Sequence, residues 1–287
     1  MKAWLVIDVH YLCHRAFHVA KDLSWKGRPT GVIFGFLKSI TWLKDELQTD
    51  RIAFCFEHPK NYRKDVYPPY KARRHGHERT SEEKASHSQL VIQICELRQR
   101  YLPQIGFKNI FCYHGMESDD SLAAIAKGCP LDEEVILVTG DSDLFQCIRS
   151  NVSIYSPQKR MLLTESWFRS KYGIPPTKWA VVKAIAGCAT DEIAGIKGVG
   201  EVSALKYVRG TLPEHTKQYQ AITSAEGKAI VRRNRALVEL PYEGCPVPML
   251  QEDQVSLDGW KEVCSLLGMR TIAGRPPVAT RVQRRMT

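Results

Sequence analysis

Short apolar segments recur along the first 155 residues, and segments with helical spacing separate them. The apolar segments are AWLVID (3–8), RIAFCFE (51–57), NIFCYH (109–114), EVILVTGD (134–141) and NVSIYS (151–156). Their lengths are typical of β-strands, and GVIFGFLKSITWLKDEL (31–47) has the spacing of a crossover helix. Strands that alternate with helices form parallel sheets, because a parallel neighbour is reached only through a crossover. The sequence therefore predicts an α/β fold with a mainly parallel central sheet.

Acidic residues stand at or just after the ends of four of these predicted strands. They are Asp8, Glu57, Glu117, Asp119, Asp120, Asp141 and Asp143. The carboxyl ends of parallel strands lie at one edge of a sheet, where ligands bind. Carboxylates so close together stay ionised near neutral pH only if cations neutralise them, and oxygen ligands suit hard ions. The set predicts a site for Mg²⁺ or Mn²⁺ that acts on a phosphodiester, with two ions activating water and stabilising the leaving oxygen.

Each acid taken singly has a second explanation. Asp119 and Asp120 would also stabilise the N-terminus of a following helix. Asp141 and Asp143 would also fit an ordinary turn after a strand. The metal-site interpretation therefore depends on the whole set, not on any one member.

The chain is strongly basic, with a formal charge of +10 over 287 residues and a pI near 9.1. This length is enough for one large α/β domain or two modest domains. A folded basic protein indicates an anionic partner, and nucleic acid is favoured over a membrane. A basic protein without such a partner is the other interpretation.

Nine cysteines are scattered singly, with no C-x-x-C pair. That pattern is typical of reduced thiols in an intracellular protein and argues against a structural zinc site. The N-terminal MKAWLVIDVH is too short in apolar residues for a signal peptide, and no run approaches the roughly 18 apolar residues of a membrane span. We expect a soluble, cytoplasmic protein, in the host cytoplasm if a phage encodes it.

Residues 58–79, HPKNYRKDVYPPYKARRHGHER, carry seven Lys or Arg residues against two acids. Lys71 and Arg74 are three residues apart, so both could face one phosphate, and Tyr70 could stack on a base. The alternative is a solvated loop. So much positive charge beside an acidic site is nevertheless expected where an anion bridges the two.

A helix is predicted directly after this basic segment. Thr80 and Glu83 have the spacing of a capping box. Val91, Ile94, Leu97 and Tyr101 then fall on one helical face, which predicts the side that is buried.

Helical patterns dominate after about residue 165, and the segment GIKGVG (195–200) lies between two of them. It is not a dinucleotide-binding G-x-G-x-x-G, because no strand clearly precedes it. It is typical of a helix–hairpin–helix, whose glycines let backbone N–H groups approach a phosphate. A packing turn between helices is the alternative. The last residues, 270–287, contain five arginines and no acid, and we expect a flexible basic tail.

Five segments together resemble the 5′-nuclease (flap endonuclease) family of phages and bacteria. They are LVIDVHYLCHRAF with Asp8 and Arg15, YRKDVYPPYKARR with Lys71 and Arg74, GMESDDSLAAIA, VTGDSDLFQCI, and GCATDEIAGIKGVG. The resemblance runs in order from Asp8 to about residue 240. It implies a PIN-like sheet, a helical arch at about 58–102 through which a single-stranded 5′ end passes, and hydrolysis of DNA near that end to leave a 5′-phosphate. It also implies a free-standing nuclease.

The resemblance assigns roles to individual residues. Lys71 and Arg74 become catalytic residues, and Arg15, Tyr70 and Arg73 become DNA contacts. The hairpin at about 184–210 would grip duplex DNA, with a K⁺ ion at the hairpin carbonyls. Its DNA-binding residues would be Gly195, Lys197, Gly198, Gly200 and Lys206.

Two positions depart from the family pattern. Glu57 stands where an aspartate is usual, and Cys188 stands where the first aspartate of G-D-x-x-D is usual, while Asp191 matches the second. A thiol is a poor ligand for a hard ion. We therefore expect an intact first ion site near Asp8, Glu117, Asp119 and Asp120, and a weakened second site near Asp141, Asp143 and Asp191.

The sequence thus predicts a metal-dependent 5′→3′ exonuclease and 5′-flap endonuclease that acts on DNA as a monomer. It leaves open whether RNA–DNA hybrids are also bound and cut. The expected division is a nuclease domain over 1–165, a helical DNA-binding subdomain over 166–269 and the tail over 270–287. One alternative is a DNA-binding protein of the same fold with weak or lost nuclease activity, which the Cys188 substitution favours. Another is a single-strand ribonuclease of the related PIN type, which would usually be shorter and lack the hairpin.

Overall fold

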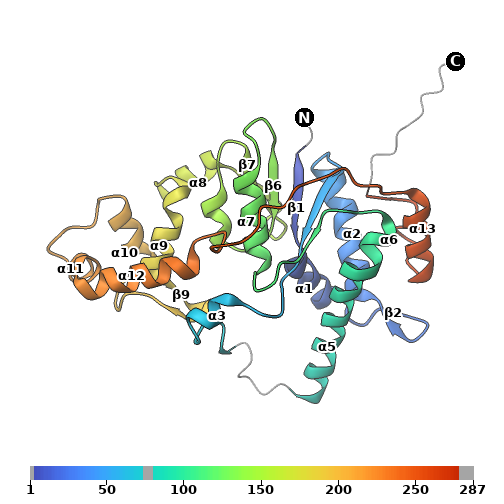
Figure 1. Cartoon of the computed structure of the whole chain (residues 1–287), viewed down its shortest axis with the longest axis horizontal. Helices are drawn as coiled ribbons and strands as arrows, with labels where there is room; N and C mark the ends of the chain where they lie inside the picture. The colour runs from blue at the N-terminus through green and yellow to red at the C-terminus, as the bar shows by residue number, and fades with distance from the viewer. Residues whose placement is uncertain (1–2, 74–79, 278–287) are drawn as a thin grey trace. The chain divides into compact units, whose positions relative to one another are not determined.

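The computed structural model describes residues 3–73 and 80–277 of the chain (Figure 1). Its contacts group into two compact units. Unit 1 comprises Met1–Phe56, Thr80–Phe111 and Met249–Thr287, and unit 2 comprises Glu57–Arg79 and Cys112–Pro248. Both units draw on segments from either side of residue 165. The predicted functional division at that residue therefore stays a prediction.

Unit 1 contains the parallel strands β1 (Trp4–Asp8), β4 (Arg51–Cys55) and β5 (Ile110–Phe111), in the order β5-β4-β1. Its other elements are α1 (Val9–Ala20), β2 (Ser24–Trp25), β3 (Arg28–Pro29), α2 (Gly31–Glu46), α5 (Ser81–Glu96), the π-helical turn η1 (Leu97–Tyr101), α6 (Leu102–Ile105) and α13 (Leu257–Leu266). Every residue of β1 is buried, as expected for a parallel strand covered on both faces. The strands expected at 3–8, 51–57 and 109–114 and the helix at 31–47 are confirmed, although β5 is shorter than predicted.

The capping box at the start of α5 is present. The Thr80 hydroxyl accepts the Glu83 N–H at 3.2 Å, and the Glu83 carboxylate accepts the Thr80 N–H at 2.8 Å. Of the predicted apolar face, Ile94, Leu97 and Tyr101 are buried, but Val91 is 45% exposed. Leu90 takes the buried position instead, so the prediction for Val91 is wrong by one residue.

Unit 2 contains the parallel strands β6 (Val135–Val138) and β7 (Val152–Ser156), with β8 (Met161–Leu163) antiparallel to β7. Around them lie α3 (Tyr62–Val66), α7 (Ser118–Gly128), the 3₁₀ turns η2 (Asp143–Cys147) and η3 (Pro176–Lys178), and α8 (Glu165–Tyr172). The remainder is α9 (Trp179–Ala186), β9 (Gly187–Cys188), η4 (Ala189–Asp191), β10 (Ile193–Ala194), α10 (Glu201–Val208), α11 (Lys217–Thr223) and α12 (Ala225–Val238). The mixed α/β fold with a mostly parallel central sheet is confirmed.

The predicted hairpin element lies between α9 and α10, both of which are confirmed helices (Figure 1). Its first half is more regular than expected. Gly187–Cys188 pairs antiparallel with Ile193–Ala194, and η4 forms the tip of this small ribbon. Helix α9 packs against both α10 and α12, so the ribbon is anchored to a helical core.

Unit 1 is completed by a late part of the chain. The Asp253 carboxylate accepts the Lys108 N–H at 2.7 Å and the Asn109 side-chain N–H at 3.0 Å. Further along, the Trp260 indole N–H donates to the Ile272 carbonyl at 3.0 Å, and Ile272 is buried. The expectation of a flexible tail is therefore wrong for residues 270–277, and residues 278–287 lie outside the described part.

No helix within residues 3–73 and 80–277 is both long enough and apolar enough to cross a membrane.

Candidate metal centre

Arg63 is the buried centre of the acidic region in unit 2. Asn61 caps α3, and Arg63, in the first turn, is only 2% exposed. Its two terminal nitrogens each lie 2.7 Å from an oxygen of Asp120, and its Nε donates to the Leu237 carbonyl at 2.9 Å. Burial opposes the positive charge, but the hydrogen bonds and charge of Asp120 dominate and raise the pKa of Arg63 above its ordinary value.

Asp120 does not have the free oxygens that a metal ligand needs. It is fully buried, and besides Arg63 it accepts the backbone N–H groups of Glu117 at 3.0 Å and Tyr242 at 2.8 Å. A carboxylate with this many donors is fully satisfied. The prediction that Asp120 binds a metal ion is therefore corrected to a structural role, in which it holds Arg63 and the start of α7.

Glu117 stands at the N-cap of α7 and is 4% exposed. Its carboxylate accepts the Tyr70 hydroxyl at 2.7 Å, lies 3.3 Å from Arg63, and forms an ion pair with Lys71. Burial and the Glu117 charge raise the pKa of Tyr70 well above its ordinary value. Tyr70 itself is 3% exposed, so its ring offers no face to a base, and the predicted stacking role is wrong.

Lys71 connects two groups of carboxylates. Its Nζ pairs with Glu117 and lies 3.8 Å from Asp191 Oδ1, while its backbone N–H donates to the Asp191 carbonyl at 3.0 Å. It adopts a left-handed backbone with φ of +52°, which an L-residue keeps only where its surroundings hold it. Although burial opposes the charge, Glu117 and Asp191 raise the pKa of Lys71, with half-buried Asp119 adding to the effect.

The second group of acids follows β6. The Asp141 N–H donates to Thr139 Oγ1 at 3.1 Å, and its carboxylate accepts the Asp143 N–H at 2.8 Å. Asp141 lies on the exposed side of the group, yet neighbouring atoms partly dehydrate its carboxylate. That dehydration, followed by the charge of Asp143, raises the pKa of Asp141 to about 6. Such a shift is expected where carboxylates lie close to one another.

Asp143, Cys188 and Asp191 bring their ligand atoms together. One carboxylate oxygen of each aspartate and the Cys188 sulfur all lie within 4.8 Å of one another. Among the described residues this is the group whose donor atoms could share one cation. The predicted convergence of Asp143 with Asp191 is therefore seen, and Cys188 lies in the group with them.

Lys183, on α9, was not predicted as a site residue. Its Nζ lies 2.8 Å from Asp143 Oδ1. Burial opposes its charge, but Asp143 raises the pKa of Lys183 above its ordinary value. Lys183 lies five residues before Cys188, on the helix that leads into the ribbon. In the sequence this position is only a weak signal, because lysines are common on helices.

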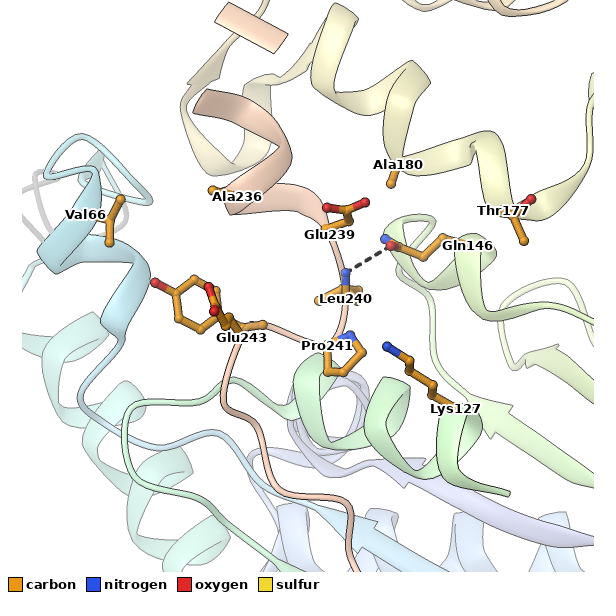
Figure 2. A pocket seen from close by; sticks show the side chains of 11 residues that line it. Val66, Lys127, Gln146, Thr177, Ala180, Ala236, Glu239, Leu240, Pro241 and Glu243 are labelled. Carbon is orange, nitrogen blue, oxygen red and sulfur yellow. Dashed lines mark hydrogen bonds between the residues drawn. The ribbon is translucent and has the colours of Figure 1, made fainter. Parts of the chain in front are cut away.

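Gln146 secures the turn that carries Asp143. Its side-chain amide donates to the Asp143 carbonyl at 2.8 Å and the Val238 carbonyl at 2.9 Å, and its oxygen accepts the Leu240 N–H at 3.0 Å. Figure 2 shows this last bond inside a cavity of about 680 Å³. None of the predicted metal ligands lines that cavity, so it is separate from the acidic site.

The glycines of the hairpin have different roles. A Cβ on Gly195 would lie 2.1 Å from the Ala186 carbonyl oxygen, so this glycine is needed for packing. Gly198, with φ of +76°, and Gly200, at the N-cap of α10, instead face open space. Lys197 and Lys206 are exposed, so an anion can reach them.

The remaining predicted site residues are placed as follows. Asp8 ends β1 in unit 1, where its carboxylate accepts the Tyr11 N–H at 3.1 Å, and Arg15 is exposed on α1. Glu57 is half-buried. Arg73 is 92% exposed at its side chain and pairs with Glu192 at 3.0 Å. Arg74 lies outside the described residues, and the participation of Asp8 and Glu57 in a metal site stays a prediction.

Comparison with known proteins identifies the class. Residues 3–173 match the model of the 5′-3′ exonuclease, N-terminal resolvase-like domain. The chain is 32% identical to the thermostable DNA polymerase I of Thermus aquaticus over 70% of its own length, but it spans only 23% of that polymerase. It is 29% identical to the 5′-3′ exonuclease of Bacillus subtilis, covering 71% of this chain and 69% of the relative.

Among solved structures, the flap endonuclease of bacteriophage T5, in a complex with DNA and metal ions, has the same fold. The TM-score is 0.71 at 21% identity, covering 95% of this chain and 99% of that one. The chain therefore belongs to the 5′-3′ exonuclease family.

Proposed function

We propose that this chain is a divalent-metal-dependent 5′→3′ exonuclease and 5′-flap endonuclease that hydrolyses DNA and leaves 5′-phosphates. The observation that carries the proposal is the position of Lys71 between Glu117 and Asp191. An ammonium that lies between two groups of carboxylates is well placed to donate to a phosphate, if metal ions bound by those carboxylates hold the phosphate between them. Membership of the exonuclease family supports the same reaction.

The donor set fits hard divalent ions, since Glu117, Asp119, Asp141, Asp143 and Asp191 offer oxygens from one unit. Bound Mg²⁺ or Mn²⁺ ions would supply an activated water and stabilise the leaving oxygen. With the carboxylates neutralised, Lys71 would release Glu117 and donate to the scissile phosphate. Lys183 would hold Asp143 in the orientation that the ion requires.

The DNA duplex would be bound by the hairpin, not by the residues that cleave the phosphodiester. Gly198 and Gly200 leave the hairpin backbone open, and Lys197 and Lys206 add exposed positive charge. This arrangement suits sequence-independent binding of a duplex phosphate, with K⁺ at the hairpin carbonyls. Arg73 and Arg15 would contact the single-stranded 5′ end, and we expect RNA–DNA hybrids to bind in the same way. The working form would be a monomer.

A DNA-binding protein with weak or lost nuclease activity is the second candidate. One observation favours it: Cys188 occupies the group in which Asp143 and Asp191 converge, and a neutral thiol contributes no charge to a hard ion. Burial raises the pKa of Cys188, so without a metal ion the thiol is neutral near pH 7.

The two candidates are separated by a duplex with a 5′ flap, labelled at its 5′ end, incubated with Mg²⁺ or Mn²⁺. The proposal predicts a released 5′ fragment, no cleavage in EDTA, and a 5′-phosphate on the shortened strand. The variant Asp141→Asn should bind the flap but not cut it. Binding without cleavage by the wild-type protein in either metal would select the second candidate.

A further inference from the structure

The donor group of Asp143, Cys188 and Asp191 mixes hard and soft ligands. Its three atoms come from two stretches of chain, the start of η2 and the ribbon that carries η4, and lie within 4.8 Å of one another. Cys188 is 9% exposed and Asp191 is 8% exposed, so two of the three donors are shielded from solvent. Carboxylates alone suit Mg²⁺ and Mn²⁺, whereas a thiolate favours zinc and similar borderline ions.

A separate observation shows that this group attracts positive charge. The Lys183 ammonium lies 2.8 Å from Asp143 Oδ1, and the Lys71 ammonium lies 3.8 Å from Asp191 Oδ1. Each aspartate of the group thus has a cationic side chain beside it.

Cys188 also has an ordinary explanation, because it belongs to an apolar cluster with Ala184, Ile193 and Leu237. A buried thiol is often only a small apolar side chain. Here, however, the sulfur lies within reach of both carboxylates and 3.0 Å from the Thr190 hydroxyl. Cys188 thus belongs to the apolar cluster, while its sulfur lies beside polar groups.

We propose that Asp143, Cys188 and Asp191 form a thiolate-containing site that binds a thiophilic divalent cation of the zinc class in preference to Mg²⁺. The inference rests on the proposed function only for its biological setting. Three protein ligands with positions left for water or substrate are typical of catalytic zinc sites. Zinc distances of about 2.0–2.3 Å would set the ligand atoms roughly 3.5 Å apart, so the side chains need to converge by about 1 Å.

Binding converts the Cys188 thiol to a thiolate, and its proton passes to solvent. One ion position of the nuclease would then respond to zinc, while the oxygen ligands Glu117 and Asp119 keep their preference for Mg²⁺ or Mn²⁺. Substitution of an aspartate by cysteine would therefore change which ion is held, not only how tightly.

The test uses Co²⁺ as a spectroscopic substitute for zinc, on the full chain in a thiol-free reductant. A cobalt–thiolate bond gives a charge-transfer band in the near ultraviolet that carboxylates alone do not give. We expect the band to saturate at one equivalent, to vanish in Cys188→Ser and Cys188→Asp, and to persist in Cys245→Ser, which alters a half-buried thiol outside the group. Zn²⁺ should displace Co²⁺ stoichiometrically, and Mg²⁺ should fail to do so at roughly a hundred-fold excess.

A missing band, a band unchanged in Cys188→Ser, or displacement by equimolar Mg²⁺ would overturn the proposal. Circular dichroism of each variant confirms that it is folded. Flap cleavage is measured separately, so the two proposals can fail independently. Cleavage in Mg²⁺ without the band refutes only the zinc-class site, and the band without cleavage in any metal refutes only the nuclease. Cys188→Asp should also lower the Mg²⁺ concentration that gives half-maximal cleavage.

Discussion

Lys71 has a more constrained position than a lysine of a solvated loop. Its left-handed backbone, its N–H bond to the Asp191 carbonyl and its buried ammonium fix both ends of the residue. Little side-chain entropy would therefore be lost if the ammonium turned to the proposed scissile phosphate. This preorganisation suits a group that acts on charge developing in the transition state.

We expect Lys71→Ala to lower the single-turnover cleavage rate by about 10²-fold or more, since one positioned donor is typically worth that much. Flap binding should change little. The matched control is Lys60→Ala, which removes an exposed lysine of the same basic segment. An unchanged single-turnover rate in Lys71→Ala would remove this residue from the mechanism.

The raised pKa of Asp141 makes the stability of the folded protein depend on pH. Its pKa is about 6 in the folded protein and roughly 3.9 in an unfolded chain, so the folded state holds the extra proton. This contribution to stability is complete below about pH 4 and is lost as the pH rises through 6. In EDTA, Asp141→Asn should therefore melt higher than the wild type at about pH 7.5, with the gap closing near pH 4.

Added Mg²⁺ provides the control for this melt. It should raise the melting temperature of the wild type, whose ionised Asp141 gains a counter-ion, and should do so less for Asp141→Asn. A variant that melts lower than the wild type at pH 7.5 in EDTA would contradict the charge-crowding explanation.

The sequence indicated which acids matter but not which partners they take. Asp143 and Asp191 converge as predicted, because Asp143 follows a strand that the apolar pattern defines and Asp191 matches an aspartate of the family motif. Asp120 looks identical to Asp119 in the sequence, and only the fold brings Arg63 onto it. Likewise, nothing in YKARR distinguishes a stacking tyrosine from Tyr70, whose hydroxyl is turned inward to Glu117.

Arg63 ties together elements that are distant in sequence. From α3 it reaches Asp120 on α7 and the carbonyl of Leu237 near the end of α12. These elements surround the carboxylates, so the arginine fixes the frame of the site. A buried pair of this kind need not add net stability, but breaking it leaves a buried charge.

We therefore expect Arg63→Met to lower the free energy of unfolding by about 3–5 kcal/mol, because Asp120 remains buried and unpaired. The double variant Arg63→Met with Asp120→Leu should recover part of the loss. Urea denaturation measures both. Equal stability of Arg63→Met and the wild type would show that water reaches Asp120 readily.

The β2–β3 hairpin offers an independent test of the fold. Ser24 pairs with Pro29 and Trp25 with Arg28, leaving Lys26 and Gly27 as a two-residue turn. Both have positive φ, +50° and +77°, which is the pattern of a type I′ turn. Lysine is a poor residue at the first of these positions.

Lys26→Asn should raise the stability by about 0.5–1 kcal/mol, because asparagine tolerates the left-handed region. Thermal melts measure the change, and Lys21→Asn, at an ordinary helical φ of −54°, is the control. A lower melting temperature for Lys26→Asn would show that Lys26 stabilises the hairpin through its contact over the Trp25 ring.

Long elements were predictable and short ones were not. The runs that became β1, β4, β6 and α2 carry enough apolar residues to define a period. Met161–Leu163 is a three-residue strand with two exposed side chains, so pairing with β7 alone defines it. The β9–β10 ribbon has two residues per strand and no sequence period to read.

The charge of the whole chain bears on the proposed binding of DNA. With +10 overall and exposed Lys197 and Lys206 at the hairpin, much of the affinity should come from released counterions. Six phosphate contacts would reduce the affinity for a flapped duplex by about 10³ between roughly 50 and 200 mM salt. Fluorescence anisotropy measures the slope, which Lys197→Ala should reduce by about one.

The same titration in KCl and NaCl at equal ionic strength examines the ion expected at the hairpin. Tighter binding in KCl is the expected result. Identical curves would argue against a specific K⁺ site, and a flat salt dependence would argue against phosphate contacts as the main source of affinity.

The interrupted path of unit 1 has a consequence for how the protein is made. A ribosome releases the chain from its N-terminus, so β1 and Asp8 emerge among the first residues. Unit 1 nevertheless waits for Asp253 and α13, while the last stretch of unit 2 already ends at Pro248. The nascent chain can therefore assemble the Glu117, Asp143 and Asp191 carboxylates before the strand that carries Asp8 has a finished core.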